Sequence, residues 1–234
     1  MFNEDIRQTL ENFLLDKVSS SFNWSMCYME YYSESDDCSD EDFSGVCEAC
    51  NANKYRSGVT KVTLFYDDLP DWVIKVPILG NYYEEDECHC DYECSGSEKA
   101  NDYCLTEVNY TQEAVESGLS NCFAKTYYVC TINEVDFYCS ERVKEVYHEK
   151  YPYKSKVSYT KPNSLQQAEQ LMKNYDSFLA TEELALFIDA YGESIAKKLI
   201  KFLLDFDITD LHHGNLGFDA NDHIKIIDCA GWRD

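Results

Sequence analysis

The residues best suited to chemistry lie near the C-terminal end of the sequence, in two short polar segments. The first is Asp210-Leu-His-His-Gly-Asn215, and the second begins at Asp228, directly after the apolar pair Ile226-Ile227. Two carboxylates and one amide oxygen are hard oxygen ligands, and a carboxylate can also accept a proton. Mg²⁺ and a phosphoryl acceptor need such groups. The combination therefore favours a metal-assisted phosphoryl-transfer site.

A lysine in the first half of the chain is a second candidate. The alternation of apolar and polar residues predicts strands over 60–66 and 72–78, joined by the turn 67–71 as an antiparallel hairpin. Lys75 lies within the second strand, between apolar neighbours. An ammonium group on an interior strand is costly to bury unless a phosphate or a carboxylate offsets the cost. The alternative interpretation is an edge-strand lysine that faces solvent.

The two C-terminal segments resemble the catalytic loop and the metal-binding "DFG" region of the protein-kinase-like superfamily. Asp-Leu-His-x-Gly-Asn is more similar to the aminoglycoside and choline phosphotransferase branch than to the His-Arg-Asp form of protein kinases. By this resemblance Asp210 is the catalytic base, while Asn215 and Asp228 bind Mg²⁺. The DFG-like motif reads Asp-Cys-Ala-Gly, so its glycine is displaced by one position.

The resemblance extends over about residues 56–231 and includes Lys75. Val73-Ile-Lys75 resembles the Val-Ala-Ile-Lys strand, whose lysine contacts the ATP phosphates. Glu107, early in a helix predicted over 102–117, resembles the helix-C glutamate that holds this lysine. Glu113 and Glu116 lie on the same helix and are alternatives to Glu107.

Two further segments are implied to contact the nucleotide. The segment 56–61 occupies the place of the glycine-rich loop but has a single glycine. Gly58, Thr60 and Lys61 would offer a backbone N–H, a hydroxyl and a charge to a phosphate.

The second of these segments, 135–143, resembles the strand that leads into the hinge of the family. By the resemblance, the carbonyl of Glu141 and the amide of Val143 read the adenine edge.

The predicted fold is α+β, a two-lobed protein-kinase-like fold. Residues 1–143 would form an N-terminal extension and a β-rich nucleotide-binding lobe, and residues 144–234 a minimal helical lobe with the catalytic and metal-binding loops. In the first lobe we expect a helix capped by Asn3, the hairpin, the helix ending before Gly118, and two strands. The ranges are 4–18 for the first helix, and 124–131 and 134–140 for the last two strands.

In the second part of the chain the pattern becomes helical. Ser164 and Gln167 fit a capping box, and Thr181 is expected to cap one long helix that ends near Leu204. A short strand is predicted over 223–227. The sequence ends at Asp234, so the resemblance implies a truncated C-lobe without the family's activation segment.

The composition limits the possible partners. The chain has 44 acidic and 20 basic residues and a formal charge of -24, which argues against binding nucleic acid or an anionic membrane through overall charge. Hydrophobic residues make up 44% of the chain, enough for a folded core. No apolar stretch is long enough to span a bilayer, and the N-terminus lacks the basic and apolar regions of a secretory signal. We therefore expect a cytoplasmic protein.

The 12 cysteines of the chain are expected to be thiols, because disulfides are rare in the cytosol. Cys47-x-x-Cys50 and the group Cys88, Cys90 and Cys94 leave a structural zinc site open. The second group lacks the usual spacing of a zinc knuckle, which favours free thiols.

Three functions are compatible with these features. The first is an ATP- and Mg²⁺-dependent phosphotransferase that acts on an unidentified small-molecule or protein acceptor, with Lys75 and Asp228 converging on one nucleotide. The second is a pseudokinase-like binding module, favoured by the single-glycine loop and the short C-lobe. The third is an acidic decoy that mimics nucleic-acid charge, which only the net charge supports.

Overall fold

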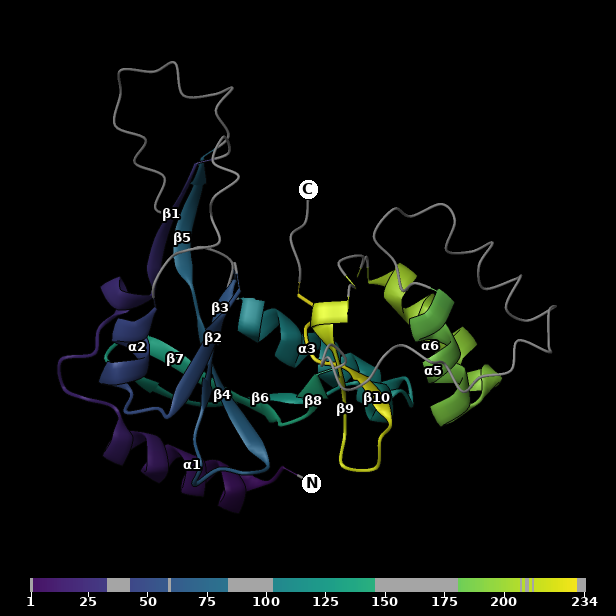
Figure 1. Cartoon of the computed structure of the whole chain (residues 1–234), viewed down its shortest axis with the longest axis horizontal. Coiled ribbons are helices and arrows are strands. Elements are labelled where there is room, and N and C mark those ends of the chain that lie inside the picture. Colours follow the sequence, from purple (N-terminus) through teal and green to yellow (C-terminus); the bar gives the residue numbers. More distant parts are fainter. Residues whose placement is uncertain are drawn as a thin grey trace. The chain divides into compact units, whose positions relative to one another are not determined.

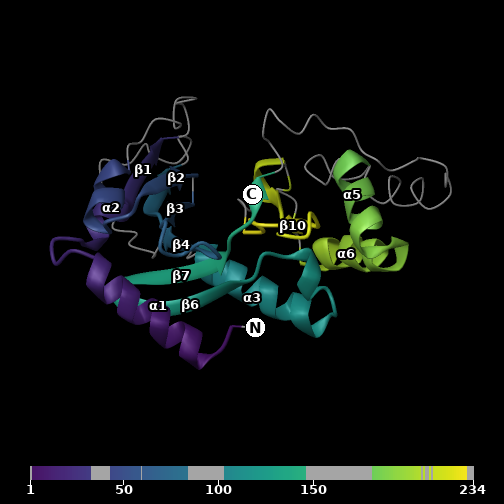
Figure 2. The ribbon, with the colours of Figure 1, turned by 60° about the horizontal axis from the view of Figure 1, so that its bottom comes forward.

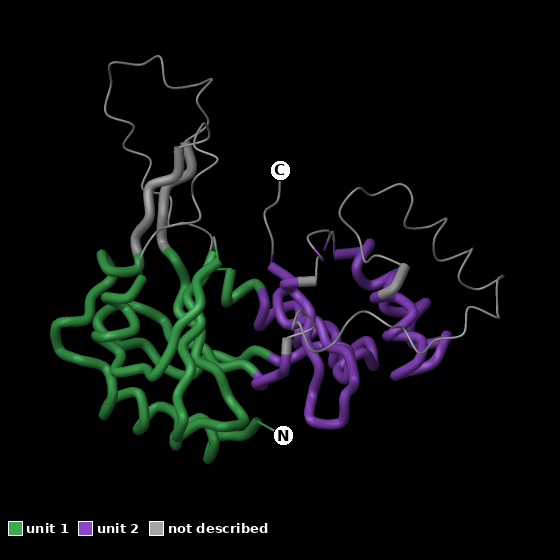
Figure 3. The backbone as a smooth tube through the Cα atoms, in the orientation of Figure 1, with its two compact units in different colours: residues 1–106, 126–140 green, residues 107–125, 141–234 purple. Residues whose placement is uncertain are grey.

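The computed structural model describes residues 2–32, 43–58, 60–83, 103–145, 181–206, 208, 211 and 213–230. It divides into two compact units (Figure 3), of which unit 1 comprises residues 1–106 and 126–140, and unit 2 residues 107–125 and 141–234. The expected lobe boundary at residue 143 lies close to the last crossing between the units. The helix expected over 102–117, however, begins in unit 1 and continues in unit 2.

Unit 1 contains a five-stranded sheet with the order β2-β3-β4-β7-β6 (Figure 1). Its strands are β2 (Lys54–Ser57), β3 (Lys61–Phe65), β4 (Trp72–Pro77), β6 (Thr126–Ile132) and β7 (Val135–Glu141). The predicted hairpin is confirmed, because β3 pairs antiparallel with β4 and places Val62 opposite Val76 and Leu64 opposite Ile74. These four residues are buried, which explains the apolar alternation of both strands. The α+β class is also confirmed.

Helix α1 (Glu4–Lys17) packs against β6, as Figure 2 shows. Its predicted cap is present, since the Asn3 side chain accepts a hydrogen bond from the Ile6 N–H at 2.9 Å. Arg7 on this helix donates to the carbonyl of Val129 on β6 at 3.0 Å. The helix thereby covers the sheet and completes the core of unit 1.

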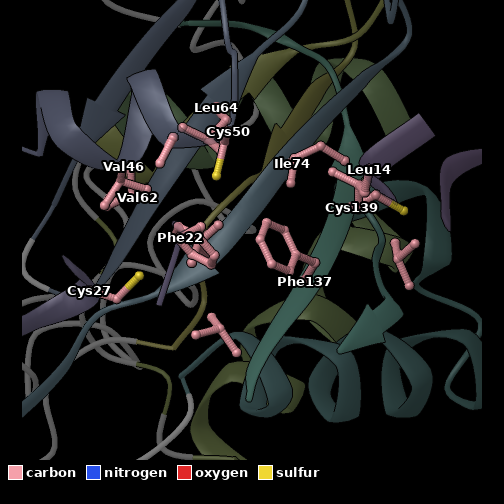
Figure 4. Close-up of a cluster of buried hydrophobic side chains, with 14 of the residues drawn as sticks. Leu14, Phe22, Cys27, Val46, Cys50, Val62, Leu64, Ile74, Phe137 and Cys139 are labelled. Atoms are coloured by element: carbon pink, nitrogen blue, oxygen red, sulfur yellow. The ribbon is translucent and has the colours of Figure 1, made fainter. Parts of the chain in front are cut away.

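The core of unit 1 lies between the sheet and its covering elements (Figure 4). The buried side chains that Figure 4 labels come from helices, strands and turns: Leu14, Phe22, Cys27, Val46, Cys50, Val62, Leu64, Ile74, Phe137 and Cys139. Five elements of the described part of this unit were not predicted. They are strand β2, the 3-10 turn η1 (Trp24–Cys27), helix α2 (Ser44–Ala49), and the parallel strands β1 (Tyr28–Tyr32) and β5 (Leu79–Tyr83).

Helix α3 (Tyr103–Glu116) connects the two units along the chain and agrees with the predicted range. It ends as expected at Gly118, whose φ of 71° is in the left-handed region that glycine adopts readily. The N–H of Gly118 donates to the carbonyl of Val115, and that of Leu119 donates to the carbonyl of Ala114.

Unit 2 is built from helices and a small sheet with the order β10-β9-β8. Its other elements are the turn η4 (Ser120–Cys122), β8 (Lys144–Glu145), α5 (Thr181–Tyr191), α6 (Glu193–Asp205), the turn η5 (His213–Asn215), β9 (Leu216–Phe218) and β10 (Ile224–Ile226). A separate core forms where the helices meet the sheet. It includes Phe123, Phe187, Leu199, Leu203, Leu216 and Ile226.

The prediction of one long helix from Thr181 to Leu204 is wrong. The chain breaks at Gly192, where φ is 82°, and forms α5 and α6 instead. The Gly192 N–H still donates to the carbonyl of Ile188, and its carbonyl accepts from Ala196. A residue without a Cβ allows this change of direction between two helices that each bury an apolar face.

Other predictions for this part of the chain have mixed outcomes. The strand expected over 223–227 is confirmed as β10. The capping box of Ser164 and Gln167 lies outside the described residues. Within the described ranges, no helix combines the length and the apolar character that crossing a membrane requires.

Candidate functional site

Asn215 and Asp228 come together at the open end of the β9–β10 hairpin. Asn215 directly precedes β9, and Asp228 follows shortly after β10. The Asn215 carbonyl accepts the N–H of Ile227 at 2.9 Å and that of Asp228 at 3.4 Å. The hairpin thus places next to each other the two residues that were predicted to bind Mg²⁺.

The core of unit 2 holds this hairpin firmly. Leu216, Ile224 and Ile226 are almost fully buried. The carbonyl of Ile226 accepts the N–H of Ala124 at 2.8 Å, and Phe123 forms a parallel bridge with Ile226. Because both strands are anchored, the backbone of Asn215 and Asp228 at their open end is held on a rigid support.

An amide oxygen and a carboxylate are the kinds of group that bind Mg²⁺ together with a nucleotide. Mg²⁺ is usually held by one or two carboxylates, waters and substrate phosphates rather than by a cage of protein ligands. Asn215 is 8% exposed and Asp228 is half-buried. Among the residues described, no group of three or more His, Cys, Asp or Glu side chains forms a metal cage. An ion at Asn215 and Asp228 would therefore complete its coordination with phosphate oxygens and water.

The predicted catalytic base, Asp210, lies outside the described residues. Its described neighbours Ile208 and Leu211 are both 3% exposed and belong to the core of unit 2.

Lys75 lies on a central strand of the unit 1 sheet. Strand β4 is between β3 and β7, and Lys75 is only 5% exposed. This excludes the edge-strand interpretation. Burial raises the pKa of Cys139 on the neighbouring strand β7, and the positive charge of Lys75 acts in the opposite direction with a smaller effect. A lysine at such a position is costly unless charge or hydrogen bonding compensates for its lost hydration.

Burial distinguishes between the three glutamates proposed on α3. Glu107 is 1% exposed, whereas Glu113 and Glu116 are both exposed to solvent. A carboxylate that offsets a buried ammonium has to be buried itself, because an exposed pair contributes little. Of the three glutamates, Glu107 is therefore the one whose burial suits the predicted partner of Lys75.

The residues predicted to contact phosphate lie between β2 and the first residue of β3. The Gly58 N–H donates to the Lys61 carbonyl at 3.0 Å, and the Thr60 carbonyl accepts from Ile78 at 2.9 Å. The N–H that was expected to bind phosphate is thus already used to close the turn. Thr60 and Lys61 are 8% and 4% exposed, so their side chains are directed away from bulk solvent.

Glu141 and Val143, the predicted adenine-reading residues, contact the β9–β10 hairpin. The Glu141 carboxylate accepts a hydrogen bond from Lys225 Nζ at 3.2 Å. Val143 lies over Gly217, where a Cβ atom would overlap the Val143 side chain. The hairpin that carries Asn215 and Asp228 therefore also supports this segment.

Comparisons of the chain with protein-family models, curated proteins and solved structures found no significant match.

The described cysteines are free thiols, and most are buried. Burial raises the pKa of Cys27, Cys50 and Cys122 to about 12. Cys47, the other member of the Cys-x-x-Cys pair, is half-buried, and burial also raises its pKa. The group Cys88, Cys90 and Cys94 lies outside the described residues. A raised pKa disfavours the thiolate, which is the form that attacks disulfides or binds metal.

Sequence reasoning missed Lys225 and Gly217 as parts of this region. Lys225 lies in an apolar strand, as Lys75 does, and the same test of a charged residue between buried neighbours identifies it. Gly217 follows a buried leucine and gives no local signal in the sequence. Its role depends on the approach of Val143, a residue distant in sequence.

Proposed function

We propose that the chain is an ATP- and Mg²⁺-dependent phosphotransferase related in its design to protein kinases. The observation that carries the proposal is the pairing of Asn215 and Asp228 at the open end of the β9–β10 hairpin. One amide oxygen and one carboxylate on a rigid support are suited to a metal ion shared with a nucleotide. Bound Mg²⁺ would neutralise charge on the β- and γ-phosphates.

The order of elements in unit 1 supports the same proposal. In protein kinases the phosphate-binding lysine is on the third strand, and its glutamate is on the helix that follows. Lys75 lies on β4, the third strand of the unit 1 sheet in chain order, and Glu107 lies on the next described helix, α3. Both residues are buried. The proposed two-lobed kinase-like fold combines this arrangement with the hairpin of unit 2.

The proposed roles follow from the chemistry of each side chain. Lys75 would stabilise the phosphate charge, and Glu107 would orient Lys75. Asp210 would accept the proton of the acceptor hydroxyl as that oxygen attacks the γ-phosphorus. The acceptor is a small molecule or a protein that carries a hydroxyl group.

One observation favours a second candidate, a module that binds a nucleotide without transferring phosphate. The Gly58 N–H closes its own turn, so the β2–β3 turn offers less to the γ-phosphate than a glycine-rich loop would. Such a module would use the same Lys75, Asn215 and Asp228 contacts. It would differ only in having no transfer activity that depends on Asp210.

Calorimetric titration with ATP, with and without Mg²⁺, tests the proposal. Wild type should bind ATP more tightly when Mg²⁺ is present, and Asp228→Ala should lose that difference. Asp205→Ala is a matched control, because it removes an exposed carboxylate of the same unit that pairs with the surface residue Lys201. Equal affinity with and without Mg²⁺ in wild type would contradict the metal role of Asp228. Release of labelled phosphate from ATP by wild type but not by Asp210→Asn would favour the transferase over the binding module.

A further inference from the structure

The proposed function leaves one buried charged cluster in unit 2 without a role. Lys225 lies on β10 between Ile224 and Ile226, on the strand that leads to Asp228, and it is 8% exposed. Its Nζ atom is 3.2 Å from Glu141 Oε2 and 3.9 Å from Asp219 Oδ2. One ammonium group thus bridges two carboxylates from different segments.

This ion pair differs from the other ion pairs described in unit 2. The lysine side chains of the pairs Lys144–Asp222, Lys197–Glu193 and Lys201–Asp205 are 64%, 49% and 77% exposed. The side chain of Lys225 is 10% exposed. Exposed pairs contribute little, whereas removal of one member of a buried pair leaves a charge without its compensation. Among these four lysines, Lys225 is therefore the one whose ion pair can fix the position of the paired carboxylate, Glu141.

The turn of the hairpin holds one of the two carboxylates in place. Asp219 Oδ1 accepts the N–H groups of Asn221 at 2.8 Å and His223 at 3.0 Å. Its other oxygen, Oδ2, faces Lys225. Asp219 is thus a fixed anchor, and Lys225 transmits that anchoring to Glu141.

Glu141 begins the segment that was predicted to read adenine. This segment joins the hairpin through β8, which has only two residues, with Lys144 opposite Phe218 and Glu145 opposite Gly217. Gly217 is also opposite Lys225 in the neighbouring pair of strands. Lys225 therefore lies in the same row across the sheet as Gly217 and Glu145. Its ion pair with Glu141 adds a contact to a β8–β9 ladder that has only two residue pairs.

We propose that Lys225 is a positioning residue that holds the Glu141–Val143 segment ready to read the base of a nucleotide. The inference rests on the proposed function. Backbone groups that recognise a base have to be held within a fraction of an ångström, which a two-residue ladder alone does not ensure. Because Asn215 and Asp228 are carried by the same hairpin, Lys225 sets the base-reading segment relative to the metal-binding pair.

The test separates binding of the base from binding of the phosphates. Affinities for adenosine and for ATP·Mg²⁺ are measured for wild type, Lys225→Met, Lys225→Arg and Asp228→Ala. Lys225→Met should weaken both ligands about tenfold, which corresponds to about 1.4 kcal/mol for each. Asp228→Ala should weaken ATP·Mg²⁺ and leave adenosine unchanged. Lys225→Arg should recover most of the loss, since a guanidinium can also bridge two carboxylates.

Two controls keep the test specific to the buried pair. Lys144→Met removes an exposed ion pair between the same segment and the same hairpin, and it should change either affinity less than twofold. Glu141→Gln breaks the buried pair from its more exposed side, so it replaces Lys225→Met if that variant does not fold.

The outcomes distinguish the two proposals. Wild-type protein that binds neither ligand would refute the proposed function and this inference together. Wild type that binds ATP·Mg²⁺ but not adenosine would overturn the inference alone. So would a folded Lys225→Met or Glu141→Gln variant that binds adenosine as tightly as wild type does.

Discussion

The side chain of Val143 lies against the backbone of Gly217. A Cβ atom on residue 217 would overlap Val143 Cγ2 and would be 2.9 Å from the carbonyl oxygen of Lys144. The absence of a side chain at this position is therefore what allows the Glu141–Glu145 segment to lie on β9. The relationship joins two residues that are far apart in the sequence and leads to a direct prediction.

Gly217→Ala should destabilise the protein. The added methyl group meets backbone as well as a side chain, and overpacking of this kind costs about 1–3 kcal/mol. Urea unfolding followed by circular dichroism measures the change. Gly58→Ala is the matched control, because a Cβ there meets no heavy atom of the described residues within 4 Å. Equal stabilities of the two variants would contradict the packing role of Gly217.

The free energy of unfolding should fall as the pH rises from about 9 to 12. Burial raises the pKa of Cys27, Cys50 and Cys122 to about 12, whereas the same thiols in the unfolded chain titrate near 9. Between these values the native state binds more protons than the unfolded state, so stability decreases with pH. Each thiol should contribute about 1.4 kcal/mol per pH unit.

Denaturant titrations at a series of pH values measure this slope. Cys122→Ala should reduce it by the contribution of one thiol. A free energy of unfolding that stays constant from pH 9 to 11 would show that these thiols are not protected from deprotonation in the native protein.

Tyr191→Phe should weaken the link between α5 and the sheet of unit 2. The hydroxyl of Tyr191 lies 2.7 Å from the Asn121 carbonyl and 2.8 Å from the Ile224 carbonyl. Loss of this donor should cost about 1 kcal/mol of unfolding free energy. Tyr128→Phe removes a hydroxyl that contacts Thr131 on an exposed hairpin, and it should cost less than about 0.5 kcal/mol. Thermal unfolding of the two variants side by side tests the difference.

Elements that depend on neighbouring residues could be predicted from the sequence. The Asn3 cap, the pairing of the strands in the 60–78 hairpin, and the end of α3 at Gly118 all follow from contacts within a few residues or one turn. Local rules for capping, alternation and glycine conformation are sufficient in these cases.

Elements that depend on distant contacts could not be predicted in this way. Lys225 and Glu141 are 84 positions apart, and the two residues of β8 form a strand only because β9 lies beside them. Gly192 interrupts a pattern that is apolar and helical on both sides, so periodicity alone predicts one helix. Residue types in the sequence indicated Asn215, Asp228 and Lys75 as candidates, whereas the contacts that hold these residues in place depend on tertiary structure.

ATP·Mg²⁺ should raise the melting temperature of the protein if Lys75 contacts phosphate. A ligand that binds only the native state adds about 2.7 kcal/mol at a hundredfold excess over its dissociation constant. Lys75→Ala should lose most of this gain, because the phosphates lose their cation. Asp210→Ala should keep the gain but lose phosphate transfer, since a general base acts on the acceptor and contributes little to nucleotide binding.

Differential scanning fluorimetry with and without ATP·Mg²⁺ measures the shift in melting temperature. Lys201→Ala, which removes an exposed cation on α6, is the control. A shift of equal size in Lys75→Ala and wild type would remove Lys75 from the proposed nucleotide site, and no shift in wild type would refute the proposed nucleotide binding.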